Sequence, residues 1–342
     1  MTAIYTDERC LAHFAPQHPE SPDRQRAAVA ALRKYPGHRW PSVSPADPSF
    51  VAAIHGDSHV RTIERIATSG GGWVDPDTFV GPESYTAALC AAGAALQAAG
   101  DVLAGHEPNA FVVVRPPGHH ATIGRPMGFC LFNNVAAAAR WTLAEGGARR
   151  AAILDIDVHH GNGTQDIFYD RADVLYYSTH QYPYYPGTGE LADTGRGDGV
   201  GATINVPLGA GCGDSIFLEI TDRVLDPALR RFAPDIILVS LGFDAHWADP
   251  LAQMRLSLDG YAAILQRVQQ LAKDLCDGRL VCVLEGGYNL RVVADGAAMV
   301  GAVLSGEPAA ADAIGGPPGE GATPTIAPLV DRLCRIHDLP AS

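Results

Sequence analysis

The residues best suited to chemistry lie in the stretch AAILDIDVHHGNGTQ, residues 151–165. An apolar run leads into Asp155, Asp157 and His159. Successive side chains of an extended strand point to opposite faces, so these three are predicted to share one face. Two buried carboxylates need compensation, which a bound cation supplies most simply. The stretch predicts a metal site. The alternative is a helix N-cap with surface charges, which explains neither the second Asp nor the histidine pair.

A third candidate ligand, Asp244, follows another apolar run, residues 236–241. Catalytic zinc sites hold three protein ligands and leave one position open for water and substrate. Asp157, His159 and Asp244 would provide such a set. Oxygen and nitrogen ligands also suit Fe(II), Co and Mn, so the ligand types do not choose among these metals. The alternative role of Asp244 is a loop carboxylate that caps a helix.

Two adjacent histidines, His119 and His120, follow the rigid turn Arg-Pro-Pro-Gly. Such a pair can place one imidazole near the attacking water and the other near the leaving group. Asp155 has the right parity to hold the tautomer of His119. Asn162 could do the same for His120 as a neutral partner. The alternative is that both histidines only fill a loop or the core.

A tyrosine, Tyr288, occurs in the sequence EGGYN after the apolar run 280–284. The two glycines allow a sharp backbone turn. A tyrosine at this position could donate a hydrogen bond to an oxyanion and help a metal to polarise a carbonyl. An aromatic plug over the core is the alternative.

The elements that carry these residues repeat one pattern, in which an apolar strand is followed by polar residues and then a helical segment. Such strands are predicted at residues 111–114, 151–154, 174–177, 236–241 and 280–284, and a short one at 3–5. Helical patterns cover residues 21–34, 50–54, 60–67, 83–103, 134–145, 215–232, 258–275, 291–304 and 329–336. Strands that are apolar on both faces and alternate with helices predict a mostly parallel α/β sheet with both faces covered. Ligand sites in such sheets lie beyond the carboxyl ends of the strands.

The domain organisation is expected to be simple. No second composition regime or repeat occurs, so residues 1–342 are interpreted as one domain. Residues 307–328 are rich in Gly, Pro and Ala and are predicted to be a flexible connection before the last helix.

Composition narrows the classes of function. The formal net charge of −13 argues against nonspecific nucleic-acid binding, which needs a basic surface. No apolar run predicts a membrane span, and the N-terminus has no secretory pattern. Seven scattered cysteines without a Cys-x-x-Cys pair favour a reducing cytoplasm. Whether the chain acts alone or as a homo-oligomer stays open.

Several motifs together resemble the zinc-dependent histone deacetylase superfamily, which includes acetylpolyamine amidohydrolases and bacterial deacetylase-like amidohydrolases. They are RPPGHH (115–120), GFCLFNN (128–134), DIDVHHGNGTQ (155–165), STHQYPYYPGTG (178–189), LGFDAHWADPL (241–251) and LEGGYNL (284–290). The resemblance implies the arginase/deacetylase fold, with an eight-stranded parallel sheet flanked by helices. It also implies hydrolysis of an N-acyl amide, typically acetyl-lysine.

By motif position, the resemblance implies that Asp157, His159 and Asp244 bind zinc. It implies that His120 is the general base for water and that His119 acts either electrostatically or as the acid. Tyr288 would polarise the acyl carbonyl. The channel for the acyl-lysine chain would have walls and space provided by Phe129, Tyr185 and Gly128.

The resemblance also implies bound potassium. One site would use Asp155, Ser178 and the main-chain oxygens of Asp157, His159 and Thr179. A second would use the carbonyls of Phe168, Arg171 and Val174. Asn162, together with GNGTQ and EGGY, looks like the class II branch of the superfamily.

The substrate is expected to be acyl-lysine or a similar linear N-acyl amine. Leu251 stands where the polyamine branch carries an acidic gatekeeper, and the 114 residues before Arg115 leave little room for the insertion that narrows a dedicated polyamine enzyme. An acetylpolyamine substrate is the alternative. The sequence HPESPDR resembles the first rim loop of the family, so Glu20 is expected to touch a cationic substrate. A simple helix-entry turn is its alternative.

Two other classes share this fold or could share this site. Ureohydrolases bind two manganese ions and need a second carboxylate after the strand that carries Asp244, where this chain has His246. An acyl-lysine binder without catalysis would not need every catalytic position to be filled.

Overall fold

The central feature of the fold is a parallel β-sheet. The computed structural model describes residues 1–319 and 324–340. Within them, seven parallel strands have the spatial order β1-β4-β9-β8-β5-β6-β7. Their bounds are β1 (Ala3–Tyr5), β4 (Ala110–Val112), β9 (Leu280–Leu284), β8 (Ile236–Leu241), β5 (Ala151–Asp155), β6 (Val174–Gln181) and β7 (Thr203–Leu208).

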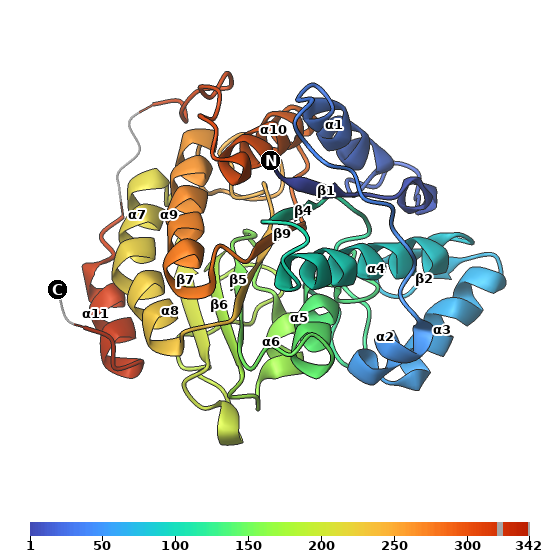
Figure 1. Ribbon diagram of the computed structural model, residues 1–342, viewed down its shortest axis with the longest axis horizontal. Coiled ribbons are helices and arrows are strands. Elements are labelled where there is room, and N and C mark those ends of the chain that lie inside the picture. The colour runs from blue at the N-terminus through green and yellow to red at the C-terminus, as the bar shows by residue number, and fades with distance from the viewer. Residues whose placement is uncertain (320–323, 341–342) are drawn as a thin grey trace.

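Helices cover both faces of this sheet, and Figure 1 shows α7, α8 and α9 on one side and α4 and α5 on the other. The first layer contains α1 (Pro22–Leu32), α7 (Asp214–Ile220), η3 (Thr221–Leu225), α8 (Asp226–Phe232), α9 (Leu258–Cys276), α10 (Leu290–Ser305) and α11 (Ala327–Ile336). The second contains η1 (Glu8–Ala12), α2 (Pro48–His55), α3 (Asp57–Thr68), α4 (Ser84–Leu103), α5 (Asn134–Ala144) and α6 (Asn162–Phe168).

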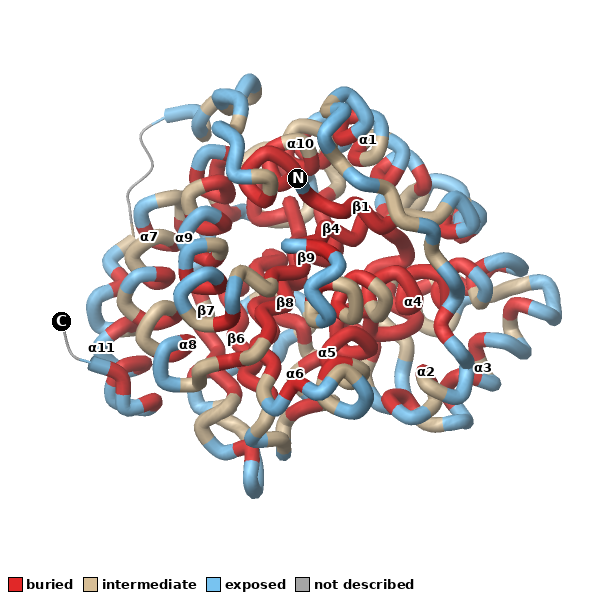
Figure 2. The backbone as a smooth tube through the Cα atoms, viewed as in Figure 1, coloured by how far each residue is buried: buried red, intermediate tan, exposed pale blue. Residues whose placement is uncertain are grey.

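Alternation along the strands divides the core in two. In β5, Ala152 and Leu154 join the first core, whereas Ile153 joins the second. Every residue of β5 is buried, and Figure 2 shows the strands as the buried centre of the molecule. The apolar runs are therefore apolar on both faces because each face is covered by helices.

The strand order reverses beside β5. The chain runs from β5 through β6 to β7 at one edge, and then returns to place β8 on the other side of β5. Such a reversal opens a crevice beyond the carboxyl ends of the two strands, where ligands bind in open α/β sheets. The carboxyl ends of β5 and β8 carry Asp157 and Asp244, respectively.

The expected number of eight sheet strands is wrong for the described residues, which form seven. Two further short strands, β2 (Gly72–Trp73) and β3 (Phe79–Val80), pair antiparallel with each other and do not join the sheet. The sequence patterns also missed β7 and α6. In β7, Asn205 and Pro207 interrupt the apolar run; proline is tolerated there because the strand lies at the sheet edge.

Most predicted helices occur within a few residues of their expected bounds. One difference lies in the expected helix at residues 215–232, which contains the π-helical segment η3 between α7 and α8. Another lies in β6, which continues through Ser178, Thr179 and His180, so these polar residues are inside the strand rather than after it.

The predicted connection at residues 307–328 is without helix or strand over its described part up to α11, and residues 320–323 lie outside the described residues. Its first half is bonded to the core. Trp247 Nε1 donates to Gly315 O at 2.8 Å, and Asp312 Oδ2 accepts from Leu258 N at 3.0 Å. The flexibility of the connection stays a prediction.

Helix α4 has the length and apolar composition of a membrane-spanning helix. In the fold it packs against α5 and the second core, and most of its most apolar part is buried. Core helices of this kind satisfy the same length and composition criteria as a span.

A buried histidine at the end of α2 makes the fold sensitive to acid. His55 Nε2 accepts from Asn133 N at 2.9 Å, and Nδ1 lies 2.7 Å from Thr122 O, which it can reach only as a donor. Neutral imidazole satisfies both contacts, whereas the charged form cannot accept. Burial, together with the neighbouring His59, lowers the pKa of His55 to about 3.

We expect this histidine to reduce stability in acid. Its folded pKa lies below the unfolded value of about 6.5, so the unfolded chain takes up the proton first and the free energy of unfolding falls as the pH drops from about 6.5 towards 3. Denaturant unfolding measured between pH 7 and 4 should show that the free energy of unfolding of His55→Gln falls less steeply with decreasing pH than that of the wild type. The difference in slope should be up to about 1.4 kcal/mol per pH unit. The exposed His106→Gln should keep the wild-type slope; an equal slope in all three proteins would contradict the expectation.

Candidate active site

Four neighbouring strands deliver the candidate catalytic residues to one edge of the sheet. The segments after β4, β9, β8 and β5 carry His119–His120, Tyr288, Asp244 and Asp157–His159, respectively. All the strands run in the same direction, so their carboxyl ends meet at this edge. The residues are far apart in sequence and close in space for this reason.

The predicted metal ligands Asp157, His159 and Asp244 form one buried group, with ligand atoms within 4.8 Å of one another. His159 Nδ1 lies 3.1 Å from Asp157 Oδ1 and 3.3 Å from Asp244 Oδ2. The route to this geometry differs from the expected strand alternation, because β5 ends at Asp155. Beyond it, Asp157 N donates to Asp155 Oδ1 and His159 N donates to Asp157 Oδ1, so carboxylates accept from these two main-chain N–H groups.

This group fits a cation such as zinc. Asp244 Oδ2 is buried and accepts no hydrogen bond. Burial opposes protonation of His159, but Asp157 and Asp244 outweigh it and raise the pKa of His159 to about 10. The pocket thus attracts positive charge. A Cβ at Gly242 or Gly286 would collide with the two carboxylates, so bare backbone holds them close together. Carboxylate oxygens and imidazole nitrogens are ligands that zinc takes in proteins.

The two adjacent histidines have different partners. His119 Nδ1 lies 3.0 Å from Asp155 Oδ2, and His120 Nδ1 lies 2.8 Å from Asn162 Oδ1. Both partner oxygens can only accept hydrogen bonds, so each histidine carries a proton on Nδ1. The Nε2 atom of each ring makes no bond to these partners. The structure therefore brings together the pairs that the sequence predicted.

The surroundings of the two imidazoles shift their pKa values in opposite directions. Burial opposes protonation of His119, but Asp155 and Asp157 raise the pKa of His119 to about 10. Burial, with the positive charges of His119 and His159, holds the pKa of His120 well below its usual range. One imidazole therefore favours the cationic form and the other the neutral form, and their ring centroids lie 4.0 Å apart. The neutral one is suited to accept a proton and the cationic one to donate one.

A pocket of about 210 Å³ opens over these residues. The predicted channel residues Gly128, Phe129, Tyr185 and Leu251 line it together with Tyr288. Gly128 adopts φ +56°, and a Cβ there would collide with the His120 ring. Its role is thus to let the backbone approach the histidine rather than to widen the channel. The full lining is Asp77, Pro117, His119, His120, Gly128, Phe129, His159, Tyr184, Tyr185, Leu251, Gly286 and Tyr288.

Glu20 is not at the rim, and its expected contact with a cationic substrate is wrong. Its side chain is fully buried, and its two carboxylate oxygens accept from Arg115 at 2.8 and 2.6 Å. Arg24 Nη1 adds a third contact at 3.1 Å. Burial opposes ionisation, but the two arginines outweigh it and lower the pKa of Glu20 to about 2. Its charge is already neutralised inside the fold.

Sequence reasoning did not name four residues that line the pocket, Asp77, Pro117, Tyr184 and Gly286. Tyr184 stacks on His159, with ring centroids 5.6 Å apart and an angle of 23° between the planes. Asp77 comes from the β2–β3 hairpin and is the one carboxylate among the described residues that line the pocket. The tandem Tyr184–Tyr185 was a signal for Tyr184, whereas nothing in the sequence linked the hairpin to the pocket.

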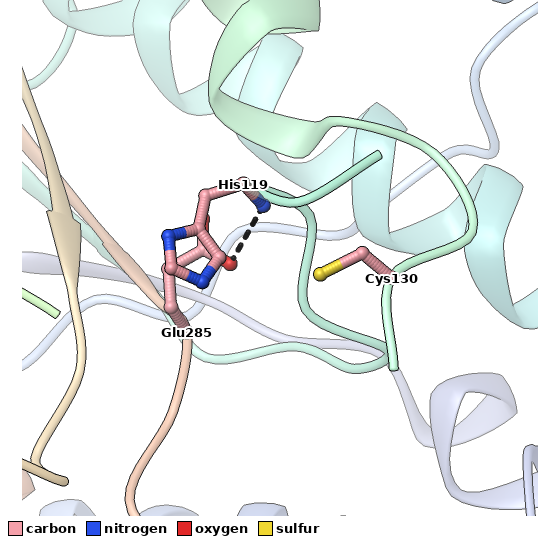
Figure 3. A group of neighbouring side chains, drawn as sticks. All are labelled: His119, Cys130 and Glu285. Atoms are coloured by element: carbon pink, nitrogen blue, oxygen red, sulfur yellow. Dashed lines mark hydrogen bonds between the residues drawn. The ribbon is translucent and has the colours of Figure 1, made fainter. Parts of the chain in front are cut away.

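A second group of potential metal ligands, His119, Cys130 and Glu285, lies beside the site (Figure 3). Its atoms already have partners. Glu285 Oε2 accepts from Gly118 N at 2.7 Å and from His119 N at 3.2 Å, and Oε1 accepts from Ser240 Oγ at 3.1 Å. Burial raises the pKa of Glu285 to about 7. We interpret this carboxyl group as a support for the histidine turn.

The residues predicted to surround potassium lie on β5 and in the segment after it, on β6, and on α6 and the turn that follows it. Ser178 is paired opposite Asp155 across the two strands, and Ser178 Oγ lies 2.9 Å from His180 Nδ1. Thr179 Oγ1 is buried without a hydrogen-bond partner. Phe168 ends α6 and its carbonyl accepts from Arg171 N at 3.0 Å, while Val174 begins β6.

Comparisons with known proteins agree on one family. The histone deacetylase domain model matches residues 18–304. The chain is 41% identical to a probable deacetylase of Archaeoglobus fulgidus, over 85% of this chain and 82% of that protein. It is 39% identical to the histone deacetylase-like amidohydrolase of Pseudomonas aeruginosa, over 84% of this chain and 82% of that protein.

A solved structure extends the agreement to the fold. The crystal structure of the HDA15 HD domain superposes with a TM-score of 0.88 and 36% sequence identity, covering 98% of this chain and 96% of that chain. The family match, the metal triad and the sheet topology point the same way. The chain therefore belongs to the histone deacetylase domain family and is a deacetylase or amidohydrolase of that family.

Proposed function

We propose that this protein hydrolyses N-acyl-lysine, or a similar linear N-acyl amine, with one zinc ion held by Asp157, His159 and Asp244. One observation carries the proposal. Two adjacent imidazoles, one bonded to a carboxylate and the other to a neutral amide, lie beside a buried metal triad and line a pocket with aromatic walls. This arrangement suits attack of water on an acyl carbonyl, followed by protonation of an amine.

Zinc, when bound, supplies a Lewis acid that polarises the acyl carbonyl and lowers the pKa of water. His120 is neutral, and its Nδ1–H group donates a hydrogen bond to Asn162 Oδ1. Its unprotonated Nε2 accepts a proton from the attacking water. Tyr288 donates its hydroxyl proton as a hydrogen bond to the carbonyl oxygen as negative charge develops there. His119, kept cationic by Asp155, either donates its Nε2 proton to the leaving amine or stabilises the charge electrostatically.

The pocket favours a linear acyl amine. Phe129 and Tyr185 provide aromatic walls for an alkyl chain, and Leu251 leaves the mouth without a carboxylate at that position. Asp77 is a carboxylate of the lining that could still attract an amine. An acetylpolyamine therefore stays the alternative substrate, and acyl-chain preference is a separate question.

A two-metal ureohydrolase is not favoured by the second position after β8. His246 occupies it, its Nδ1 accepts from Ala248 N at 3.1 Å, and its side chain is buried. The imidazole is thereby engaged with its own loop. A mononuclear site follows more naturally from this arrangement.

We also propose potassium binding beside the zinc site. Asp155 and Ser178, opposite each other on β5 and β6, would hold one ion with main-chain oxygens of Asp157, His159 and Thr179. The carbonyls of Phe168, Arg171 and Val174 would hold a second. The buried oxygen of Thr179 without a partner is compatible with an oxygen-rich site. A cytoplasmic location is proposed with them, supported by seven free, buried cysteines.

Substrate comparison tests the proposal. Purified protein with about one zinc per chain should hydrolyse acetyl-lysine peptides with a higher kcat/KM than acetylated polyamines. His120→Ala should lose about 10²–10⁴-fold in kcat and retain its zinc. Preference for the polyamine would select the alternative substrate. Two bound manganese ions would favour the ureohydrolase, and peptide binding without turnover would favour a catalytically silent binder.

A further inference from the structure

One buried carboxylate outside the metal group joins two catalytic loops. Asp249 lies in the loop after β8, with 6% of its surface exposed. Its Oδ2 accepts from Tyr288 N at 2.6 Å and from Asn289 N at 3.3 Å, both in the loop after β9. Its Oδ1 accepts from Leu251 N at 3.0 Å, within its own loop. A single side chain thus fixes the main chain at a pocket-wall residue and at Tyr288.

Two further contacts hold these loops together. Asn289 Nδ2 donates to Ala248 O at 3.0 Å, and Phe243 N donates to Gly286 O at 3.1 Å. Gly287 adopts φ +109°, where a Cβ would collide with Phe243. Because glycines 286 and 287 leave the chain before Tyr288 intrinsically flexible, its direction depends on bonds such as those to Asp249.

We propose that Asp249 is a positioning residue that holds the Tyr288 main chain, so that the Tyr288 hydroxyl reaches the carbonyl oxygen of the substrate. This inference rests on the role given to Tyr288 in the proposed function. The Tyr288 ring is confined by Phe129, at a centroid distance of 5.8 Å, and by the Arg24 guanidinium, 5.0 Å from the ring centroid. Those contacts limit the ring laterally, whereas Asp249 fixes its point of attachment.

The physical basis is the placement of a hydrogen-bond donor. Donors stabilise an oxyanion only when they are held at the position where charge develops, and a shift of about 1 Å can cost about 10²-fold in rate. Removing the Asp249 carboxylate leaves two main-chain N–H groups of the Tyr288 loop without their acceptor. The loop is then expected to relax towards other partners and to move the hydroxyl.

A double-mutant comparison tests the proposal against a merely structural role. Asp249→Ala should lower kcat about 10–100-fold for an acyl-lysine peptide and leave zinc content and KM nearly unchanged. In a Tyr288→Phe background, where the hydroxyl is absent, the same change should cost less than about threefold. Additive losses, or loss of zinc, would overturn the proposal. Asp249→Asn, which keeps one acceptor oxygen, replaces the alanine variant if that variant does not fold. Its kcat should be lower than that of the wild type by less than the loss expected for Asp249→Ala.

Asp235 provides a matched control. It precedes β8, whereas Asp249 follows it, and its Oδ2 accepts two consecutive main-chain N–H groups, from Arg149 at 2.7 Å and Arg150 at 3.0 Å. It therefore joins two loops by the same chemistry at the opposite end of the strand. Asp235→Ala should lower the free energy of unfolding without changing kcat.

A spectroscopic readout separates this proposal from the choice of substrate. With 3-fluorotyrosine incorporated at position 288, the fluorine resonance should shift or broaden in Asp249→Ala and stay unchanged in Asp235→Ala. An unchanged resonance in both variants would contradict the positioning role even if no acyl-lysine were hydrolysed. Absence of hydrolysis in the wild type would instead count against the proposed function.

Discussion

Replacing Asp157 with alanine is expected to remove the bound metal, whereas replacing Asp155 with asparagine is expected to leave it in place. The two carboxylates are two residues apart and both are buried, yet their contacts differ. Asp157 Oδ1 lies 3.1 Å from His159 Nδ1, and Asp157 belongs to the candidate metal triad with Asp244. Asp155 is directed to His119 and to the main chain of Asp157. We therefore expect the first to act as a metal ligand and the second to support the proposed catalytic histidine.

Metal analysis and kinetics separate these roles. The zinc content of Asp157→Ala should fall from about one ion per chain to almost none, because a three-ligand site loses a charged ligand. Asp155→Asn should keep its zinc and lose about 10–100-fold in kcat, because a neutral amide no longer stabilises the His119 cation. Equal loss of zinc in both variants would refute this division of roles.

The central strands were predictable from sequence because they are apolar on both faces and end in polar residues. β7 was not, since Asn205 and Pro207 break its apolar run. The number of strands came from family resemblance rather than from the patterns, and the structure corrects it from eight to seven in the described residues. The apolar patterns thus located the central strands correctly, whereas the strand number implied by the resemblance was wrong.

The candidate site divides in a similar way. Residues at strand ends, such as Asp244 and Tyr288, converge because parallel strands share one edge. Glu20 was misplaced because Arg115, which binds both of its carboxylate oxygens, is 95 positions away in the chain, although Arg24 is only four positions on. Asp249 and Glu285 were not singled out from the sequence because their contacts are to main-chain N–H groups, which no residue pattern indicates.

Removing a single hydroxyl, in Tyr288→Phe, should lower kcat by about 10²–10³-fold, the usual cost of losing one donor to an oxyanion. The ring should keep its place, because Phe129 and Arg24 contact its aromatic surface rather than its hydroxyl. Zinc should also be retained, because the metal triad does not include this residue.

The distribution of the loss between kcat and KM carries the mechanistic meaning. A donor that acts only as charge develops on the carbonyl oxygen lowers kcat and kcat/KM equally and leaves KM unchanged. A Tyr288→Phe variant with raised KM and normal kcat would show instead that the hydroxyl binds the ground-state substrate. Measuring both parameters on one acetyl-lysine peptide, with zinc content determined on the same samples, distinguishes these outcomes. Full activity in this variant would show that the Tyr288 hydroxyl is not needed to stabilise the carbonyl oxygen, and would contradict the proposed mechanism.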